Sequence, residues 1–231
     1  MKRTGRLAAV CAELSPCARF ADVGCDHGYC TQFMLENGLC RGAVISDVSA
    51  KSLAKAEKLL QAYIGEGRVQ SVCCAGLSAV PPCDEVLIAG MGGEEIVSIL
   101  REGFLPPQLV LQPMKNAPKV RAFLLESGYR ILHDYTYFEG RKRYHILRAA
   151  KAPAEELSAG DVQGYGAAEL AFGRDNLLTP SAAFLRYLEG EIAALGARMA
   201  AANGPLPAAK QRLQLAEAAL AAARGGRHEH P

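Results

Sequence analysis

The sequence predicts an α/β fold: a doubly wound, seven-stranded sheet with an antiparallel C-terminal strand pair, followed by an α-helical coiled-coil hairpin. Three observations support this prediction. Short apolar strands alternate with helical segments up to residue 128, two later strands are joined by only four residues, and apolar residues recur at 3,4 spacing behind residue 181. The 231 residues should therefore form two domains, 1–155 and 156–231.

Glycines and capping residues mark the ends of the predicted elements. The first strand ends on Gly24, the helix after it ends on Gly38, and Ser49 is placed to cap the next helix. The segment 85–90 is almost wholly apolar, as a parallel strand covered on both faces should be. The expected strands are 18–24, 43–49, 69–74, 85–90, 108–113, 129–138 and 143–150, and the expected helices are 6–17, 31–38, 50–64, 94–101 and 119–126.

The connection 139–142 decides the kind of sheet. Four residues cannot hold a crossover helix, so the last two strands must be antiparallel. Five strand–helix units followed by a β-hairpin fit the Rossmann-like sheet of class I S-adenosylmethionine methyltransferases better than the all-parallel sheet of dinucleotide dehydrogenases. In such sheets the ligand lies beyond the carboxyl ends of the strands. This directs attention to residues 22–29, 47, 74–76 and 89–93.

The C-terminal part predicts a helical hairpin. Apolar residues recur through Leu185, Leu188 and Ile192, an alanine-rich helical run begins at Ala209, and the stretch 203–207 between the two runs breaks the helix. Two helices so connected should pack antiparallel. Either the hairpin packs on its own sheet or on a second subunit, or it is an arm that contacts a large substrate. Residues 151–180 are expected to be a linker that ends in a short docking segment, 164–180.

Composition excludes several classes of protein. With 26 Lys and Arg against 24 Asp and Glu the net charge is +2, which excludes a long basic tail that coats nucleic acid. The eight cysteines lie between Cys11 and Cys83 and contain no C-x-x-C pair, so no metal site is expected. The chain shows no secretory signal and no apolar run long enough to cross a bilayer. We therefore expect a cytoplasmic protein with reduced thiols and no membrane partner.

The first glycine-rich strand end suits a cationic ligand. It runs from Asp22 to Tyr29 and departs from the dinucleotide fingerprint G-x-G-x-x-G, because Asp26 stands where the second glycine belongs. A carboxylate there would repel a pyrophosphate, whereas Asp22 and Asp26 would attract the ammonium and sulfonium of S-adenosylmethionine. Asp47, at the end of the second strand, is placed to accept hydrogen bonds from ribose hydroxyls.

Two further strand ends carry candidate residues. Glycines from Gly90 to Gly93 leave backbone N–H groups open around a ligand, or they form only a tight strand-to-helix turn. At the end of the fifth strand and just beyond it, Gln112 and Asn116 can read the edge of a base and Lys115 can meet a phosphate. Asn116 is equally suited to cap the following helix.

These motifs together resemble the bacterial tRNA (adenine-22-N1)-methyltransferase family, TrmK. The chain carries D-x-G-x-D-H-x-Y at 22–29, I-A-G-M-G-G at 88–93 and L-Q-P at 111–113, followed by the strand at 143–151 and the helical tail. The resemblance implies a class I fold, S-adenosylmethionine as cofactor, tRNA as partner and 1-methyladenosine as product. DNA is not expected as a partner, and a monomer or weak homodimer is expected.

The resemblance and the strand ends together assign roles to the residues. Tyr29 would stack on the target base or merely pack at a helix start, and Asp26 or His27 would orient the amino group or take a proton. The expected catalytic residues are Asp26, His27 and Tyr29; the cofactor-binding residues are Asp22, Gly24, Asp47, Val48, Ala75, Gly76, Gly90, Met91 and Gly92; and the substrate-binding residues are Gly93, Gln112, Lys115, Asn116, Arg141, Lys142 and Arg143. Arg101, Lys119 and Arg121 are further candidates for contact with tRNA phosphates.

The sequence departs from the family pattern at two places. Ala75 stands where the family usually has the Asp of G-D-G-L, and Met114 stands where it usually has the Asn of Q-P-N. These changes imply weaker cofactor binding or a shifted target. They also leave open a catalytically reduced RNA-binding protein of the same fold, or a class I methyltransferase acting on another RNA site or on a small molecule.

Overall fold

A computed structural model of the chain describes residues 5–153, 164–202 and 204–225. It contains a seven-stranded sheet in the order β3-β2-β1-β4-β5-β7-β6, so the predicted Rossmann-like sheet with its antiparallel C-terminal strand pair is confirmed. The strands are β1 (Cys17–Val23), β2 (Cys40–Asp47), β3 (Val69–Cys73), β4 (Glu85–Gly92), β5 (Gln108–Lys115), β6 (Tyr129–Glu139) and β7 (Lys142–Lys151).

The register of the central strands brings their carboxyl ends to one edge. β1 pairs parallel to both β2 and β4, with Val23 beside Ser46 on one side and Ile88 on the other. Phe20, in the same strand, is completely buried, as expected for a strand covered on both faces. The turns that follow β1, β2 and β4 therefore lie next to one another.

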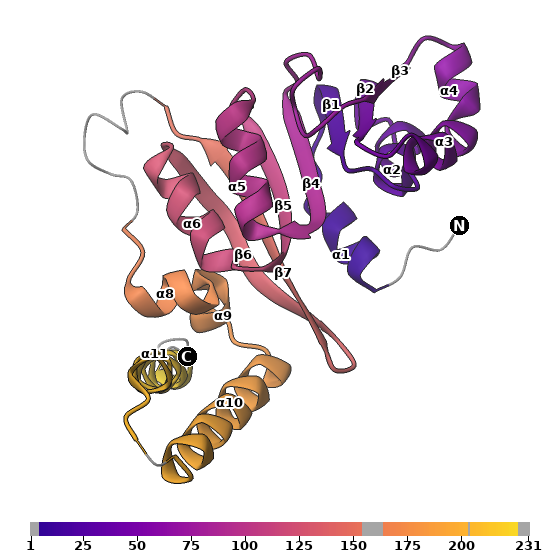
Figure 1. Cartoon of the computed structure of the whole chain (residues 1–231). Coiled ribbons are helices and arrows are strands. Elements are labelled where there is room, and N and C mark those ends of the chain that lie inside the picture. Colours follow the sequence, from indigo (N-terminus) through magenta and orange to yellow (C-terminus); the bar gives the residue numbers. More distant parts are fainter. Residues whose placement is uncertain (1–4, 154–163, 203, 226–231) are drawn as a thin grey trace. The chain divides into compact units, whose positions relative to one another are not determined.

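Helices pack against the strands of the sheet. Figure 1 shows α5 and α6 side by side over β4 and β5, where they pack against each other and against these strands.

No helix within the described ranges is long and apolar enough to cross a membrane. The helices are α1 (Arg6–Ala12), α2 (Tyr29–Glu36), α3 (Ala50–Leu59), α4 (Gln61–Gly65), α5 (Gly93–Glu102), α6 (Ala117–Glu126), α8 (Ala167–Phe172), α9 (Arg174–Leu178), α10 (Ala182–Ala200) and α11 (Pro207–Gly225).

Two predicted helices have different ends in the structure. The helix expected over 6–17 ends at Ala12, because the chain then turns so that the N–H and hydroxyl of Ser15 donate to the buried carboxylate of Glu85. The helix expected over 50–64 is interrupted at Leu60, whose side chain is completely buried. Its predicted cap is confirmed, since the Ser49 hydroxyl accepts a hydrogen bond from the N–H of Ser52.

The β-hairpin is tighter than its sequence predicts. β6 continues to Glu139 and β7 begins at Lys142, so only Gly140 and Arg141 connect them. Gly140 has a φ of 59°, which a two-residue hairpin connection favours. On its other side, β7 pairs antiparallel with β5, with Leu147 beside Leu111.

The chain divides into two compact units: Met1–His133 with Tyr144–Val162, and Asp134–Arg143 with Gln163–Pro231. The second unit has its own core, made by Phe172, Leu177, Phe184, Leu188, Ala216 and Ala219. It includes the tip of the β-hairpin, where the N–H of Thr136 donates to the side chain of Asn176. The expected boundary at 155/156 falls in 154–163, outside the described residues, and stays a prediction.

Candidate functional site

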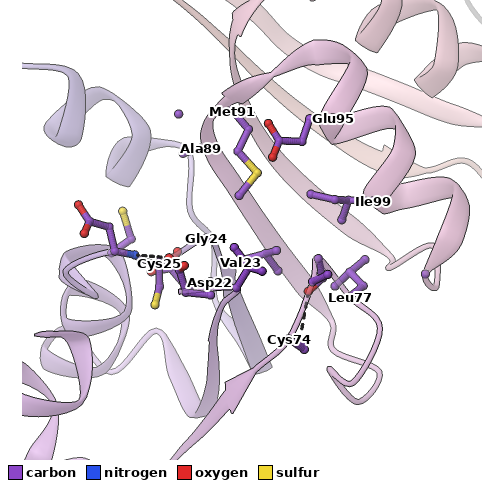
Figure 2. Close-up of a pocket in the computed structure, with 18 of the residues that line it drawn as sticks. Asp22, Val23, Gly24, Cys25, Cys74, Leu77, Ala89, Met91, Glu95 and Ile99 are labelled. Carbon is purple, nitrogen blue, oxygen red and sulfur yellow. Dashed lines mark hydrogen bonds between the residues drawn. The ribbon is translucent and has the colours of Figure 1, made fainter. Parts of the chain in front are cut away.

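A cavity of about 840 Å³ opens at the carboxyl ends of β1, β2 and β4, in the first unit. Its size suits a ligand of the class of cofactors and nucleosides. Figure 2 shows side chains from several separate chain segments converging on it. Eleven of the residues predicted for the site line it: Asp22, Gly24, Asp26, His27, Tyr29, Asp47, Val48, Ala75, Gly76, Gly90 and Met91.

The turn after β1 brings backbone to the cavity wall. Gly24 has a φ of 71°, and its N–H donates to the carbonyl of Ser46 on the neighbouring strand at 2.8 Å. The Met91 methyl group packs against this glycine, since a Cβ on Gly24 would lie only 2.0 Å from it. Figure 2 shows the Met91 side chain running from the end of β4 toward this turn. A larger residue at position 24 would need both a strained backbone and displacement of Met91.

Asp22 lies at the base of the cavity and is almost completely buried. Its carboxylate accepts a hydrogen bond from the Thr31 hydroxyl at 3.0 Å. Burial raises the pKa of Asp22 to about 7, and the carboxylate of Asp47 adds to that effect. A cation that entered the cavity beside Asp22 would favour its ionised form, so the site is suited to bind a positively charged group.

Asp47 and Asp26 form an acidic rim on the same side of the cavity. The Asp47 carboxylate accepts hydrogen bonds from the N–H of Ser49 at 2.8 Å and from the N–H of Asp26 at 3.4 Å. Asp26 has a left-handed backbone, with a φ of 44°, and its carboxylate accepts from the Lys55 ammonium at 2.8 Å. That hydrogen bond lowers the pKa of Asp26, so this carboxylate stays ionised at neutral pH.

His27 and Tyr29 form a pair of stacked rings on the cavity wall. Their ring centroids are 5.4 Å apart and the ring planes differ by 12°. Tyr29 is the first residue of α2, where the left-handed Gly28 precedes it. Both rings line the cavity, and their flat arrangement provides a surface on which another planar ring can stack.

The glycine-rich end of β4 and the start of α5 contain residues that line the cavity and residues that pack. Gly90, with a φ of 82°, and Met91 line the cavity, whereas Gly92 and Gly93 do not. A Cβ on Gly93 would lie 2.5 Å from the carbonyl oxygen of Asn116, so glycine is required there for the close approach of β5. Gly93 thus has a packing role in this structure, and its predicted contact with the substrate stays a prediction.

The predicted residues at the end of β5 and the start of α6 do not line the cavity. Gln112 is 0% exposed, and its amide accepts a hydrogen bond from Arg6 and donates one to the sulfur of Met114. Asn116 takes the N-cap position of α6 with a φ of 55°, but its side chain makes no capping hydrogen bond. Neither Gln112, Lys115 nor Asn116 lines the cavity, so their predicted contact with a base stays a prediction.

One of the basic residues expected to contact tRNA is buried, and the others are exposed. Arg121 is 0% exposed within the first unit, which corrects the expectation that it meets a phosphate. In the second unit, the Arg143 guanidinium stacks on Tyr187, 4.2 Å from the ring centroid. Arg141 and Lys142 are exposed near the hairpin tip, and Arg101 and Lys119 are exposed in the first unit.

Cys25 lines the cavity but is not an activated thiol. Burial raises its pKa well above the usual range, and the carboxylates of Asp22 and Asp47 add to the effect. The thiol therefore remains protonated at neutral pH and is a poor nucleophile.

Several residues of the site had not been expected from the motifs. Thr31 holds Asp22, and Lys55 holds Asp26, but a threonine or lysine inside a helical segment carries no sequence signal for such a contact. Arg6 lines the cavity from the start of α1. No motif of the sequence analysis included Arg6.

Comparisons with known proteins agree with this fold. The family model described as a methyltransferase domain matches residues 3–147. The tRNA (adenine(22)-N(1))-methyltransferase of Bacillus subtilis (strain 168) is 27% identical over 176 residues, which cover 71% of this chain and 74% of that protein. M. capricolum TrmK, solved in complex with S-adenosyl-homocysteine, is 19% identical with a TM-score of 0.83 and covers 97% of this chain and 100% of that one. The m1A22 tRNA methyltransferase TrmK of B. subtilis is 21% identical with a TM-score of 0.75, covering 97% and 98%.

Proposed function

Because the chain belongs to the family of methyltransferase domains, we propose that it methylates N1 of an adenine in tRNA, with S-adenosylmethionine as cofactor and position 22 as the expected target. The observation that carries the proposal is the joint placement of Asp22, Gly24 and Asp47 around one cavity, at the carboxyl ends of two neighbouring parallel strands. This is the place in a doubly wound sheet where a nucleoside ligand is expected.

The residues of the cavity fit each part of this cofactor. The buried carboxyl of Asp22 faces a space that a cationic amino group would suit. Asp47 has lone pairs left to accept from ribose hydroxyls after its two backbone hydrogen bonds. Val48, which is 76% exposed beside Asp47, and Ala75 offer small apolar surfaces for a purine ring. Ala75 stands where the family usually has an aspartate, so this part of the cavity has a methyl group in place of a carboxylate.

The cofactor, when bound, supplies an electrophilic methyl group. N1 of adenine already has a free lone pair, so its attack requires no strong base, and positive charge develops on the base as the bond forms. The cavity is lined by five carboxylates: Asp22, Asp26, Asp47, Glu95 and Glu102. An ionised carboxylate near the base would stabilise that developing charge, since electrostatic stabilisation acts most where charge forms. This assigns catalysis mainly to positioning and to charge.

The stacked pair His27 and Tyr29 is the proposed platform for the target base. N1 lies on the Watson–Crick edge, so the adenine has to leave its stack before the reaction. A base that stacked on these rings would lie beside Asp26, whose carboxylate Lys55 holds in place. Asp26, ionised at neutral pH, would accept a hydrogen bond from the exocyclic amino group and so orient the base. His27 would then act in orientation rather than as a base.

The rest of the tRNA would be bound by surfaces outside the cavity. The two long helices of the second unit, α10 and α11, are candidates, and so are the exposed basic residues Arg141 and Lys142. We also propose a cytoplasmic location, where unmodified tRNA is available, and a monomer or weak homodimer. DNA is not expected to be a substrate.

The test is mass spectrometry of tRNA nucleosides after incubation with S-adenosylmethionine. Unmodified transcripts of a tRNA that has adenine at position 22 should gain 1-methyladenosine, and the same transcripts with guanine at that position should not. Methylation of the second transcript would point to another RNA site. Binding of tRNA without any methyl transfer would instead support the catalytically reduced protein, for which Ala75 and Met114 are the motivating departures.

A further inference from the structure

The cavity has an uneven distribution of charge. Five carboxylates line it, whereas among the lining residues that the structure describes Arg6 is the only arginine or lysine. The proposed cofactor carries an ammonium, a sulfonium and a carboxylate. The first two groups have several possible acidic partners in the cavity. The carboxylate, by contrast, would be repelled by all five acidic side chains and needs a cation of its own.

Arg6 is held in one orientation by two contacts. Its Nη1 donates to Oε1 of Gln112 at 2.9 Å, and its guanidinium carbon lies 5.6 Å from the ring centroid of Tyr144. Gln112 is itself fixed, because it is fully buried and its Nε2 donates to the sulfur of Met114 at 3.4 Å. That second hydrogen bond determines which atom of the amide faces Arg6. The guanidinium is therefore preorganised rather than free to rotate into solvent.

The guanidinium also lies at the edge of the sheet where the cavity opens. A Cβ on Gly90 would be 3.3 Å from Nη1 of Arg6, so the two groups are in close contact. Val23 pairs with Ile88 between β1 and β4, which places the turns at Gly24 and Gly90 beside each other. Arg6 thus stands at the carboxyl end of β4, next to the strand β1 that carries Asp22.

We propose that Arg6 binds the carboxylate of the amino-acid part of S-adenosylmethionine and that Gln112 is its positioning residue. This inference rests on the proposed function and names a group of that same site. A guanidinium binds a carboxylate through two parallel hydrogen bonds, which gives both affinity and orientation. With Asp22 toward the ammonium and Arg6 toward the carboxylate, the amino-acid end of the cofactor is fixed at both of its charged groups.

The test measures binding by titration calorimetry with two probes. One is S-adenosylhomocysteine, and the other is its decarboxylated analogue, which keeps the ammonium and lacks the carboxylate. We expect the wild-type protein to prefer S-adenosylhomocysteine, and Arg6→Gln to lower that affinity about 10- to 100-fold while changing the affinity for the analogue by less than about twofold. Arg6→Lys should retain part of the preference, because it keeps the charge but not the paired hydrogen bonds.

Two further variants make the test specific. Arg101→Gln is the matched control, since Arg101 is an exposed arginine that does not line the cavity, and it should leave both affinities unchanged. Gln112→Asn shortens the side chain by one methylene and so moves the amide oxygen away from Arg6. This variant should reduce the preference for S-adenosylhomocysteine less than Arg6→Gln does. If Gln112→Asn retains the full preference, the positioning role of Gln112 is overturned. Thermal unfolding of each variant establishes that it is folded.

The outcomes separate this inference from the proposed function. If wild-type protein binds S-adenosylhomocysteine but shows no preference over the analogue, the role of Arg6 is wrong and the proposed function stands. The same holds if Arg6→Gln binds both probes as the wild type does and instead raises the KM for tRNA, which would assign the guanidinium to a phosphate of the substrate. If the wild-type protein binds neither probe, the proposed function itself fails.

Discussion

The carboxyl group of Asp22 is costly to ionise in the folded protein. Burial raises its pKa to about 7 from 3.8, so between these pH values the native state holds a proton that the unfolded state has lost. Stability must therefore fall as the pH rises from about 4 to about 7, the opposite of a salt-bridged carboxylate. This unfavourable group is the kind of feature that a binding site retains for its ligand.

Asp22→Asn should reverse both effects of that carboxyl group. We expect the difference in the free energy of unfolding, variant minus wild type, to increase as the pH rises from 4 to 8, since each unit of pKa shift is worth about 1.4 kcal/mol. The affinity for S-adenosylhomocysteine should fall at least about tenfold. Denaturant titrations at several pH values and calorimetry measure the two effects.

Asp84→Asn is the matched control for this variant. Asp84 precedes β4 at the opposite end of the strand, where it accepts from the N–H of Arg19 at 2.7 Å. It should leave the affinity for S-adenosylhomocysteine unchanged. An Asp22→Asn protein that binds this probe with wild-type affinity would contradict the assignment of Asp22 to the cofactor.

Tyr29 is expected to act through its ring rather than its hydroxyl. Tyr29→Phe should keep kcat/KM for tRNA within a few-fold, whereas Tyr29→Ala should lower it by about 10- to 100-fold, since stacking is worth roughly 1–3 kcal/mol per base. Neither variant should change the affinity for S-adenosylhomocysteine. Tyr63→Ala serves as the control, because Tyr63, on α4, contacts the Arg68 guanidinium through its ring and does not line the cavity. Equal activity of Tyr29→Ala and Tyr29→Phe would leave Tyr29 as a packing residue.

Among the elements, the pair α10 and α11 owes its close packing to alanine. Ala216 and Ala219 of α11 are completely buried in the core of the second unit, against Phe184 and Leu188 of α10. The ion pair of Arg212 with Glu191, at 2.6 Å, joins the same two helices. Small side chains on one helix allow larger apolar ones on the other to fill the space between them.

Ala216→Leu tests this packing directly. Three added carbon atoms cannot fit without displacement of the neighbouring helix, and we expect the variant to be destabilised by about 1–3 kcal/mol. Ala218→Leu, two residues away on the exposed face, should change the free energy of unfolding by less than about 0.5 kcal/mol. Thermal or denaturant unfolding compares them, and equal stabilities would show that α10 and α11 do not pack closely.

The elements that the sequence predicted correctly depend on local signals. Gly24 and Gly38 end their elements, and Ser49 caps α3, because each of these residues acts on backbone within a few positions. The errors have distant causes. α1 ends early because the hydroxyl of Ser15 donates to Glu85, and the helix expected over 50–64 is interrupted at Leu60, whose side chain is buried. No local pattern reports such contacts.

The same distinction applies to the site. Motifs at strand ends located the residues that line the cavity, since parallel topology alone brings those ends together. They did not separate lining residues from packing ones near the end of β5, where Gln112 is buried, nor did they reveal the contact of Lys55 with Asp26. Such assignments depend on side-chain packing across distant segments.

At the scale of the whole molecule, two units with separate cores predict separable functions. Deleting one heptad from each long helix, 194–200 and 207–213, would shorten the helical pair by about 10 Å while keeping the core residues Phe184, Leu188, Ala216 and Ala219. If this pair contacts tRNA, methylation should fall at least about tenfold in kcat/KM.

The affinity of the shortened protein for S-adenosylhomocysteine should stay unchanged, because the cavity lies in the first unit. Calorimetry and a methyl-transfer assay measure the two quantities. Full methylation by the shortened protein would show that the tips of the long helices are not needed for tRNA recognition.

The strand order also has a consequence for how the protein is made. β1 lies between β2 and β4, and its partner in β4 is synthesised only after β2, β3 and their helices. One edge of this apolar strand therefore stays unpaired until β4 has been synthesised. An unpaired apolar edge favours association with other chains. We expect nascent chains arrested before residue 85 to be the ones that chaperones hold, and the binding cavity to form only once β4 has emerged.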